Sequence, residues 1–210
     1  MNFDASCWHK INLSIDNALK INPIEYIQQN PYRENEICFY DPGKSGVWRL
    51  NSQTSLNQDW IDYIKEHTGL EIAGVCVFWK RANFQEDVAH VDLGFKDEQD
   101  SNTAYPIPCA LNWVYGDDTG QMVWYKLPRT IPKFKISSSK NSHMSWDLNS
   151  LTRVDKTVVG NNLTLCRTNI PHSIDMGDKD RWLISARVRE DKDFDSWEQS
   201  LKLLDKYIIK

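Results

Sequence analysis

From Glu71 to Arg189 the chain consists of short segments rich in β-branched and aromatic residues, separated by polar turns. Strands that follow one another this closely leave no room for the crossover helices of βαβ units. They favour antiparallel sheets folded as a sandwich or a barrel. We therefore predict a mostly β fold, with strands over residues 71–81, 87–94, 104–115, 121–127, 152–159, 163–167 and 181–189.

Helices are expected outside this strand-rich region. The spacing of apolar residues predicts a short helix over Pro23–Gln29 and a longer one over Asn57–His67, which Gly69 ends. Between them, residues 37–40 and 47–50 flank a Pro-Gly turn and predict a hairpin. An apolar stripe predicts a last helix lying on the outer face of a sheet, formed by Phe194, Trp197, Leu201, Leu204 and Ile208.

A chain of 210 residues with 40% hydrophobic content is long enough for one domain with a sizeable core. We expect a single domain over residues 1–210. Residues 1–70 would form a helical and hairpin support, residues 71–190 the strand-rich core, and residues 191–210 the C-terminal helix.

Charge and hydropathy narrow the choice of partners. The formal net charge of −4 gives no overall attraction to nucleic acid or to an anionic membrane. No apolar run of about 18 residues occurs, so no membrane span is expected. The N-terminus lacks the basic start and apolar core of a secretory signal. We expect a small-molecule or peptide substrate; the sequence does not predict the oligomeric state.

The five cysteines, at positions 7, 38, 76, 109 and 166, are widely spread and form no CxxC pair. This spacing argues against a structural zinc site and against a disulfide framework. Reduced cysteines in apolar strands behave as small hydrophobic residues. We therefore expect a reducing, cytoplasmic location, which would also keep a bound iron in the ferrous state.

A metal site is predicted by His90-Val91-Asp92 and the distant His172. Residues two apart in a strand point to the same side, so His90 and Asp92 can bind one ion. With His172 they offer two imidazoles and one carboxylate. This set can occupy one face of an octahedral metal and leave the opposite face open, as in non-haem Fe(II) oxygenases.

The strand over residues 181–189 supplies a cation for the same site. Alternation places Arg181, Ser185 and Arg187 on one side of it. Arg181 can form a bidentate pair with the far carboxylate of a 2-oxo acid, and Arg187 is the second choice for this contact. Asn112 can donate to the carboxylate nearer the metal; the alternative for Asn112 is a hydrogen-bonded amide in the core.

In its order, His-x-Asp, distal His and then Arg on the next strand, the chain resembles the Fe(II)/2-oxoglutarate-dependent dioxygenases over about residues 71–190. Residues 105–115 and 122–126 are also similar to the middle strands of small members of that superfamily. The resemblance implies a double-stranded β-helix, or cupin-like jelly roll. It also implies Fe(II) and the co-substrate 2-oxoglutarate, with ascorbate as a candidate reductant, and names no substrate.

Several functions fit this pattern. The leading one is hydroxylation of a small molecule or a protein side chain. Arg181 and Arg187 have the spacing of the arginine pair in dioxygenases that repair alkylated nucleic acid, but the acidic charge argues against phosphate binding. A non-catalytic jelly-roll binding module is a further alternative. A cupin-type metal enzyme without 2-oxoglutarate would have no use for Arg181, and a fold alone cannot choose between them.

Two further regions bear on the site. His143 is the rival to His172 as third ligand, whereas His67 is expected to cap or pack against a helix and His9 lies in a terminal segment. Residues 128–150 read as a long loop between the two halves of the metal site. Such a loop is a candidate lid over the substrate or a simple surface loop.

Overall fold

The computed structural model describes residues 6–29, 31–32, 37–95, 104–115, 120–135, 143–189 and 196–210. The strands are β1 (Trp8–Lys10), β2 (Ile37–Asp41), β3 (Ser45–Leu50), β4 (Glu71–Lys80), β5 (Val88–Phe95), β6 (Ala104–Pro106), β7 (Cys109–Val114), β8 (Gln121–Tyr125), β9 (Lys133–Lys135), β10 (His143–Asp147), β11 (Arg153–Val158), β12 (Thr164–Arg167), β13 (His172–Asp175) and β14 (Arg181–Arg189). The helices are α1 (Pro23–Gln29), α2 (Ser52–Ser55), α3 (Gln58–Thr68) and α4 (Trp197–Leu204), with 3-10 turns at Leu148–Ser150 and Asp205–Tyr207.

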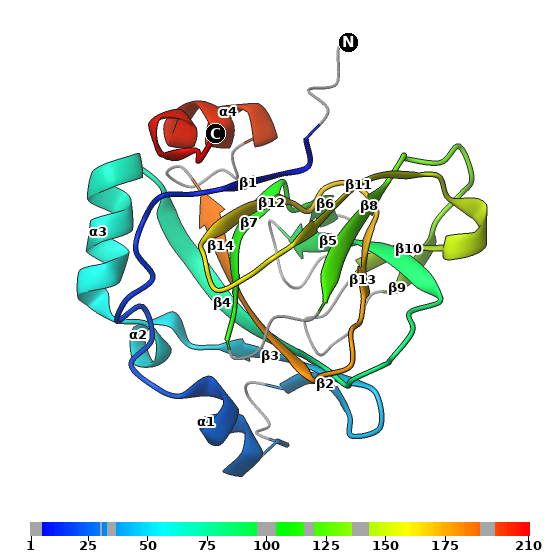
Figure 1. Ribbon diagram of the computed structural model, residues 1–210, viewed down its shortest axis with the longest axis horizontal. Coiled ribbons are helices and arrows are strands. Elements are labelled where there is room, and N and C mark those ends of the chain that lie inside the picture. Colours follow the sequence, from blue (N-terminus) through cyan, green and yellow to red (C-terminus); the bar gives the residue numbers. More distant parts are fainter. Residues whose placement is uncertain are drawn as a thin grey trace.

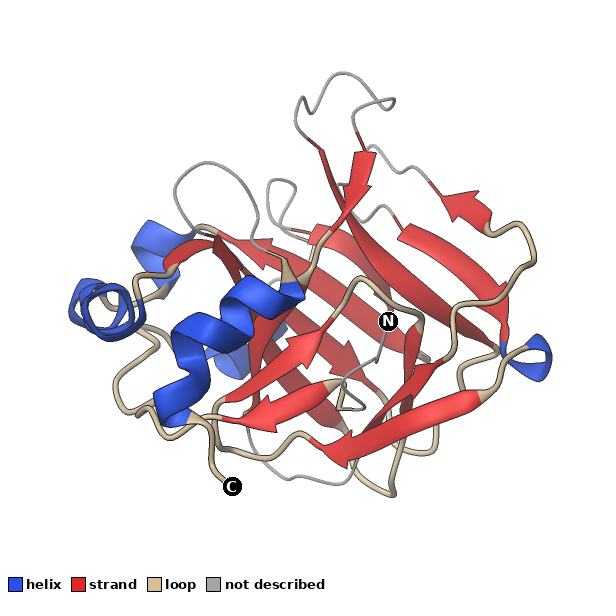
Figure 2. Ribbon diagram, turned by 90° about the horizontal axis from the view of Figure 1, so that it is seen from above, coloured by secondary structure: helices blue, strands red, loops and turns tan. Residues whose placement is uncertain are grey.

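The strands form two antiparallel sheets that face each other (Figures 1 and 2). The strand order is β1-β12-β7-β14-β4-β3-β2 in the first sheet and β11-β8-β13-β5-β10-β9 in the second, where β6 also pairs with β5. The chain passes repeatedly from one sheet to the other, as in the steps β4 to β5, β7 to β8, β11 to β12 and β13 to β14. This interleaving is a double-stranded β-helix, so the predicted jelly roll is confirmed.

Helices α3 and α4 lie against the first sheet (Figure 1), and the largest hydrophobic core is formed by residues of these helices and of that sheet. Ile184, Ala186 and Val188, which alternate along β14, pack there with Trp60 and Ile64 of α3. The alternate residues of β14 therefore face the space between the two sheets. The helical layer thus stabilises the strand that forms one wall of the site described below.

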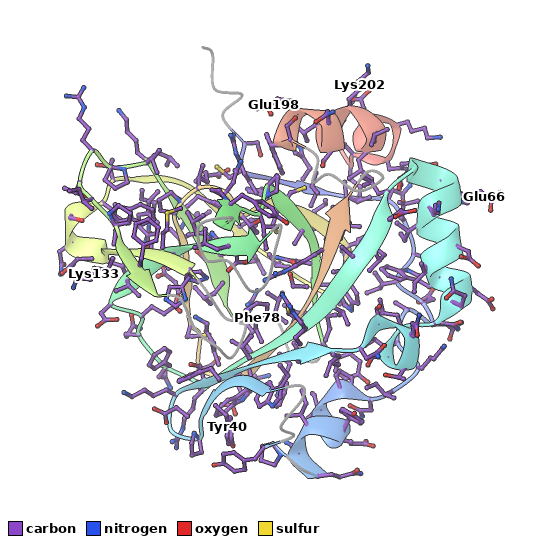
Figure 3. The ribbon with its side chains drawn as sticks, turned by 180° about the vertical axis from the view of Figure 1, so that it is seen from behind. Tyr40, Glu66, Phe78, Lys133, Glu198 and Lys202 are labelled. Carbon is purple, nitrogen blue, oxygen red and sulfur yellow. The ribbon has the colours of Figure 1, made fainter. Side chains whose placement is uncertain are left out.

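Helix ends follow the sequence signals. The side chain of Asn57 caps α3, and Gly69 ends it in a left-handed conformation with φ 77°. Ser196 forms a capping box at the start of α4. Glu66 and Glu198 point outward from these two helices (Figure 3), which leaves their apolar sides to the core. Among the described residues, no helix is long and apolar enough to cross a membrane.

The elements of the structure differ from the predicted ones at several places. Residues 104–115 are two strands, since the chain crosses between the sheets at Ile107 and Pro108. Residues 172–175 form β13, a strand too short for alternation to reveal. The last helix ends at Leu204, and the expected Phe194 lies outside the described residues.

The described part of residues 128–150 is not all loop, contrary to the prediction. Strands β9 and β10 pair with each other, and β10 pairs with β5, so these two strands extend the second sheet. Short strands with charged residues at a sheet edge are hard to distinguish from a loop in sequence. The expected lid falls partly on residues 136–142, which lie outside the described residues.

Candidate metal centre

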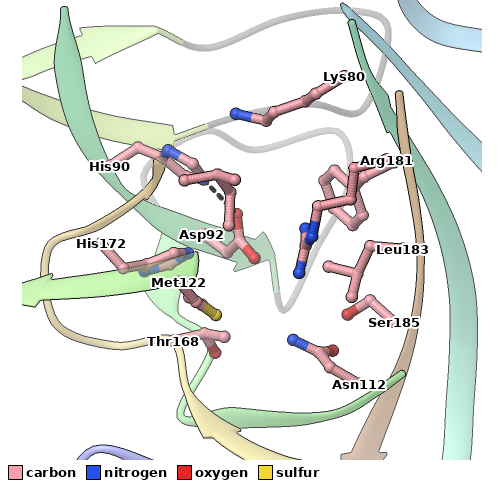
Figure 4. A pocket seen from close by; sticks show the side chains of 12 residues that line it. Lys80, His90, Asp92, Asn112, Met122, Thr168, His172, Arg181, Leu183 and Ser185 are labelled. Carbon is pink, nitrogen blue, oxygen red and sulfur yellow. Dashed lines mark ion pairs between the residues drawn. The ribbon is translucent and has the colours of Figure 1, made fainter. Parts of the chain in front are cut away.

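Two strands of the second sheet bring two histidines and one aspartate together (Figure 4). His90 and Asp92 share one face of β5, and His172 of β13 lies directly opposite His90. The metal-binding atoms of the three residues lie within 4.8 Å of one another, and Nε2 of His90 is 3.8 Å from Oδ1 of Asp92. Atoms this close together can share one ion, since metal–ligand bonds to such groups are about 2.0–2.2 Å long. Two nitrogens and one carboxylate oxygen suit Fe(II).

Both histidines are in the state that a metal ligand requires. Burial lowers the pKa of His90 well below its usual value, and the neighbouring His172 lowers it further. Burial also lowers the pKa of His172, against the opposing effect of Asp92. Nδ1 of His172 lies 3.0 Å from the carbonyl oxygen of Ile170. If Nδ1 carries the proton and donates it there, Nε2 keeps its lone pair for a metal.

A pocket between the sheets, here called the central pocket, has the triad as one wall (Figure 4). The empty space among its lining residues amounts to about 430 Å³, a volume that includes open solvent at its mouth. Phe78 lies in the middle of the molecule (Figure 3), on the side of β4 that faces this space. The lining residues are Phe78, Lys80, His90, Asp92, Asn112, Met122, Thr168, His172, Ile174, Arg181, Leu183 and Ser185.

The wall opposite the triad is β14, which presents Arg181, Leu183 and Ser185 to the pocket. Arg181 is only 2% exposed, and its guanidinium points into the pocket (Figure 4). A guanidinium in this position can hold a carboxylate through two parallel hydrogen bonds. Gly120 makes room for it, because a Cβ atom there would lie 2.7 Å from Cδ of Arg181.

Polar groups continue from Arg181 to the inner end of the pocket. Ser185 and Asn112 lie opposite each other on β14 and β7, and both are buried. Oδ1 of Asn112 has no hydrogen-bond partner among the described residues. A buried amide oxygen without a partner costs free energy. Oδ1 of Asn112 is therefore open to a hydrogen-bond donor of a bound molecule.

The other predicted candidates lie outside this set. Arg187 does not line the central pocket, and the β14–β4 register shifts just after it. His143 lies opposite Asp92 on β10, with its ring 5.8 Å from that of His90, beside the triad rather than within it. Nδ1 of His67 lies 2.9 Å from the Tyr63 carbonyl oxygen, consistent with the expected packing role.

Sequence reasoning missed two charged residues next to the triad. Lys80 lines the pocket and forms an ion pair with Glu86, and the two side chains are only 11% and 13% exposed. The signal for Lys80 was available, since a lysine that follows the apolar run 75–79 and alternates with Phe78 must share its inward face. Glu86 lies in a turn-rich segment that gives no such signal.

Comparisons with known proteins give only distant similarity. No family model matches the chain, and no curated protein matches its sequence. Among solved structures, procruciferin, an 11S globulin from Brassica napus, is 11% identical with a TM-score of 0.34, over 73% of this chain and 28% of that one. The chain spans only 28% to 38% of the first seed-globulin and oxalate decarboxylase chains it matches.

Two smaller structures match over more of their own length. The epimerase SnoN, in complex with Fe³⁺, alpha-ketoglutarate and nogalamycin RO, is 12% identical with a TM-score of 0.39, over 86% of this chain and 77% of that one. HygX from Streptomyces hygroscopicus, with nickel and 2-oxoglutarate bound, is 12% identical with a TM-score of 0.34, over 87% and 82%. Scores below 0.5 are too low to transfer an activity to this chain.

Proposed function

We propose that this protein is an Fe(II)- and 2-oxoglutarate-dependent oxygenase that hydroxylates a small molecule or a protein side chain. One observation carries the proposal: the His90–Asp92–His172 group and the buried Arg181 face each other across a single pocket. A metal-binding triad alone would fit many enzymes. A buried arginine opposite it adds a site for a second anionic group, as a dicarboxylate co-substrate requires.

The chain's own residues have distinct tasks in this proposal. His90, Asp92 and His172 would hold Fe(II), which supplies the oxidative chemistry together with 2-oxoglutarate and O2. Arg181 would bind the far carboxylate of the co-substrate, while Asn112 and Ser185 would contact its polar groups. Phe78, Met122 and Leu183 line the same pocket and would exclude water from it.

The alternatives fit the pocket less well. A repair dioxygenase would use both Arg181 and Arg187, but Arg187 does not line the pocket. A non-catalytic binding module gives no reason for two neutral imidazoles, His172 buried and His90 partly buried, beside a carboxylate. A metal enzyme without 2-oxoglutarate gives no reason for a buried Arg181 on the opposite wall.

Release of succinate from 2-oxoglutarate is the decisive assay. Purified protein is incubated with Fe(II), ascorbate and 2-oxoglutarate, with and without a panel of amino acids and peptides. We expect succinate above the level of an Asp92→Ala control. Iron bound at the triad with no 2-oxoglutarate binding by calorimetry would support the cupin-type alternative instead.

A further inference from the structure

The second sheet opens beside the proposed metal ligands. Strand β13 pairs with β8 at four positions but with β5 at a single one, His172 opposite His90. Beyond that pair, the backbone of β13 has no β5 partner in register. The third ligand therefore lies at the point where one of its two flanking strands is lost.

Glu86 fills this opening. Its Oε2 accepts a hydrogen bond from the backbone N–H of Ile174 at 2.7 Å, on the β5 side of β13. Its Oε1 is paired with Nζ of Lys80, which comes from β4 in the other sheet. One carboxylate thus replaces a missing strand partner of β13 and connects the two sheets across the edge of the pocket.

The same carboxylate balances an unfavourable pair of charges. Lys80 and Arg181 are directly opposite each other on β4 and β14, and both line the pocket. Like charges at opposed positions destabilise a sheet. Burial and the charge of Arg181 lower the pKa of Lys80 to about 7 and so disfavour its charged form, whereas an adjacent anion favours it. Glu86 is that anion, which leaves Arg181 as the cation that points toward Asn112 (Figure 4).

We propose that Glu86 is a positioning residue: its bonds to Ile174 and Lys80 hold β13 against β4 and thereby fix His172 for metal binding. This inference rests on the proposed metal site, but the bond to Ile174 can be tested without a metal. Groups that orient a metal ligand commonly change metal affinity by about 10- to 100-fold when they are removed.

The test compares Glu86→Ala, Glu86→Gln and a control, Asp175→Asn. Asp175 lies on the same strand, where it pairs with Arg153 at the exposed end, and it does not line the pocket. Two quantities are measured: the exchange rate of the Ile174 amide in metal-free protein, and Co(II) affinity by visible absorption. For Glu86→Ala we expect amide exchange faster by about tenfold or more and Co(II) affinity about tenfold weaker.

Glu86→Gln keeps an oxygen that can accept from Ile174 but removes the anion beside Lys80, so the Ile174 amide should stay protected while the Co(II) affinity falls by an intermediate amount, about threefold. Asp175→Asn should change neither quantity. If Glu86→Ala does not fold, Glu86→Leu removes the acceptor while filling the space. Wild-type exchange and wild-type Co(II) affinity in the alanine or leucine variant would overturn the proposal. Loss of Ile174 protection in a chain whose wild type binds no Co(II) would leave the Glu86 contact standing and refute the metal site.

Discussion

Asp92 is the charged member of the proposed triad, so metal binding should depend on it most directly. Asp92→Ala would leave two neutral imidazoles to hold a divalent ion, and we expect no detectable Fe(II) by elemental analysis after reconstitution. His172→Ala should weaken binding strongly and leave the fold intact. Asp175→Asn, which removes a carboxylate from the exposed end of β13, is the control. Wild-type iron content in Asp92→Ala would refute the assignment of the triad.

Arg181 and Arg187 differ in the structure although they share a predicted face. Because Arg181 lines the pocket and is buried, Arg181→Ala should raise the 2-oxoglutarate concentration for half-maximal turnover by about one to three orders of magnitude, or about 1.4 to 4 kcal/mol. Arg187→Ala should have little effect. Succinate release at varied 2-oxoglutarate measures both, and the reverse ranking would contradict the placement of β14.

A substitution at Gly120, which lies against the Arg181 side chain, also tests the proposed contact between Arg181 and 2-oxoglutarate. A Cβ atom at this position would lie 2.7 Å from Cδ of Arg181, so Gly120→Ala must displace the guanidinium. We expect weaker 2-oxoglutarate binding by about tenfold with unchanged Co(II) affinity, since the triad lies across the pocket. Calorimetry with 2-oxoglutarate measures the first quantity. Unchanged binding in this variant would show that the far carboxylate is held elsewhere.

At the level of elements, α3 supports the first sheet and depends on how it ends. Gly69 has a φ of 77°, and no atom lies within 4 Å of the site of an added Cβ. Gly69→Ala should therefore destabilise the protein by about 1 kcal/mol through backbone strain alone. Gly74 also has open space around it, within β4, but no left-handed φ, so Gly74→Ala should be neutral or stabilising. Unfolding in guanidinium chloride measures the free energy of unfolding of both variants. Equal decreases in Gly69→Ala and Gly74→Ala would rule out backbone strain as the cause.

Over the whole molecule, the periodicity of apolar residues predicted the secondary structure that neighbouring residues determine. Strands with clear alternation, such as β4, β5 and β14, and helices with caps, such as α3, could be located from sequence. Alternation also placed His90, Asp92 and Arg181 on inward faces. What could not be predicted depends on pairing between distant segments. Three features arise only when the sheets are assembled: the loss of pairing between β5 and β13 after His172, the pairing of β10 with β5, and the proposed role of Glu86.

The free energy of unfolding of the whole molecule should also depend on pH through its buried thiols. Cys7 and Cys166 are free and buried, and burial raises the pKa of each thiol from 9.0 to about 12. A thiol with a raised pKa favours folding fully below the unfolded pKa, near 9, and this contribution is lost as the pH rises from 9 toward 12. The midpoint of guanidinium unfolding, followed by tryptophan fluorescence, should therefore fall above about pH 9.

A Cys7→Ala/Cys166→Ala double variant separates this effect from other alkaline titrations. It should be less stable than wild type at pH 8 because it loses buried volume, but its midpoint should fall less steeply between pH 9 and 10.5. Leu165→Ala, which truncates a fully buried neighbour of Cys166 on β12, should lose stability at every pH and keep the wild-type slope. Parallel pH profiles for wild type and the double variant would show that the thiols do not contribute to the decrease in stability above pH 9. That decrease would then arise from other titrating groups.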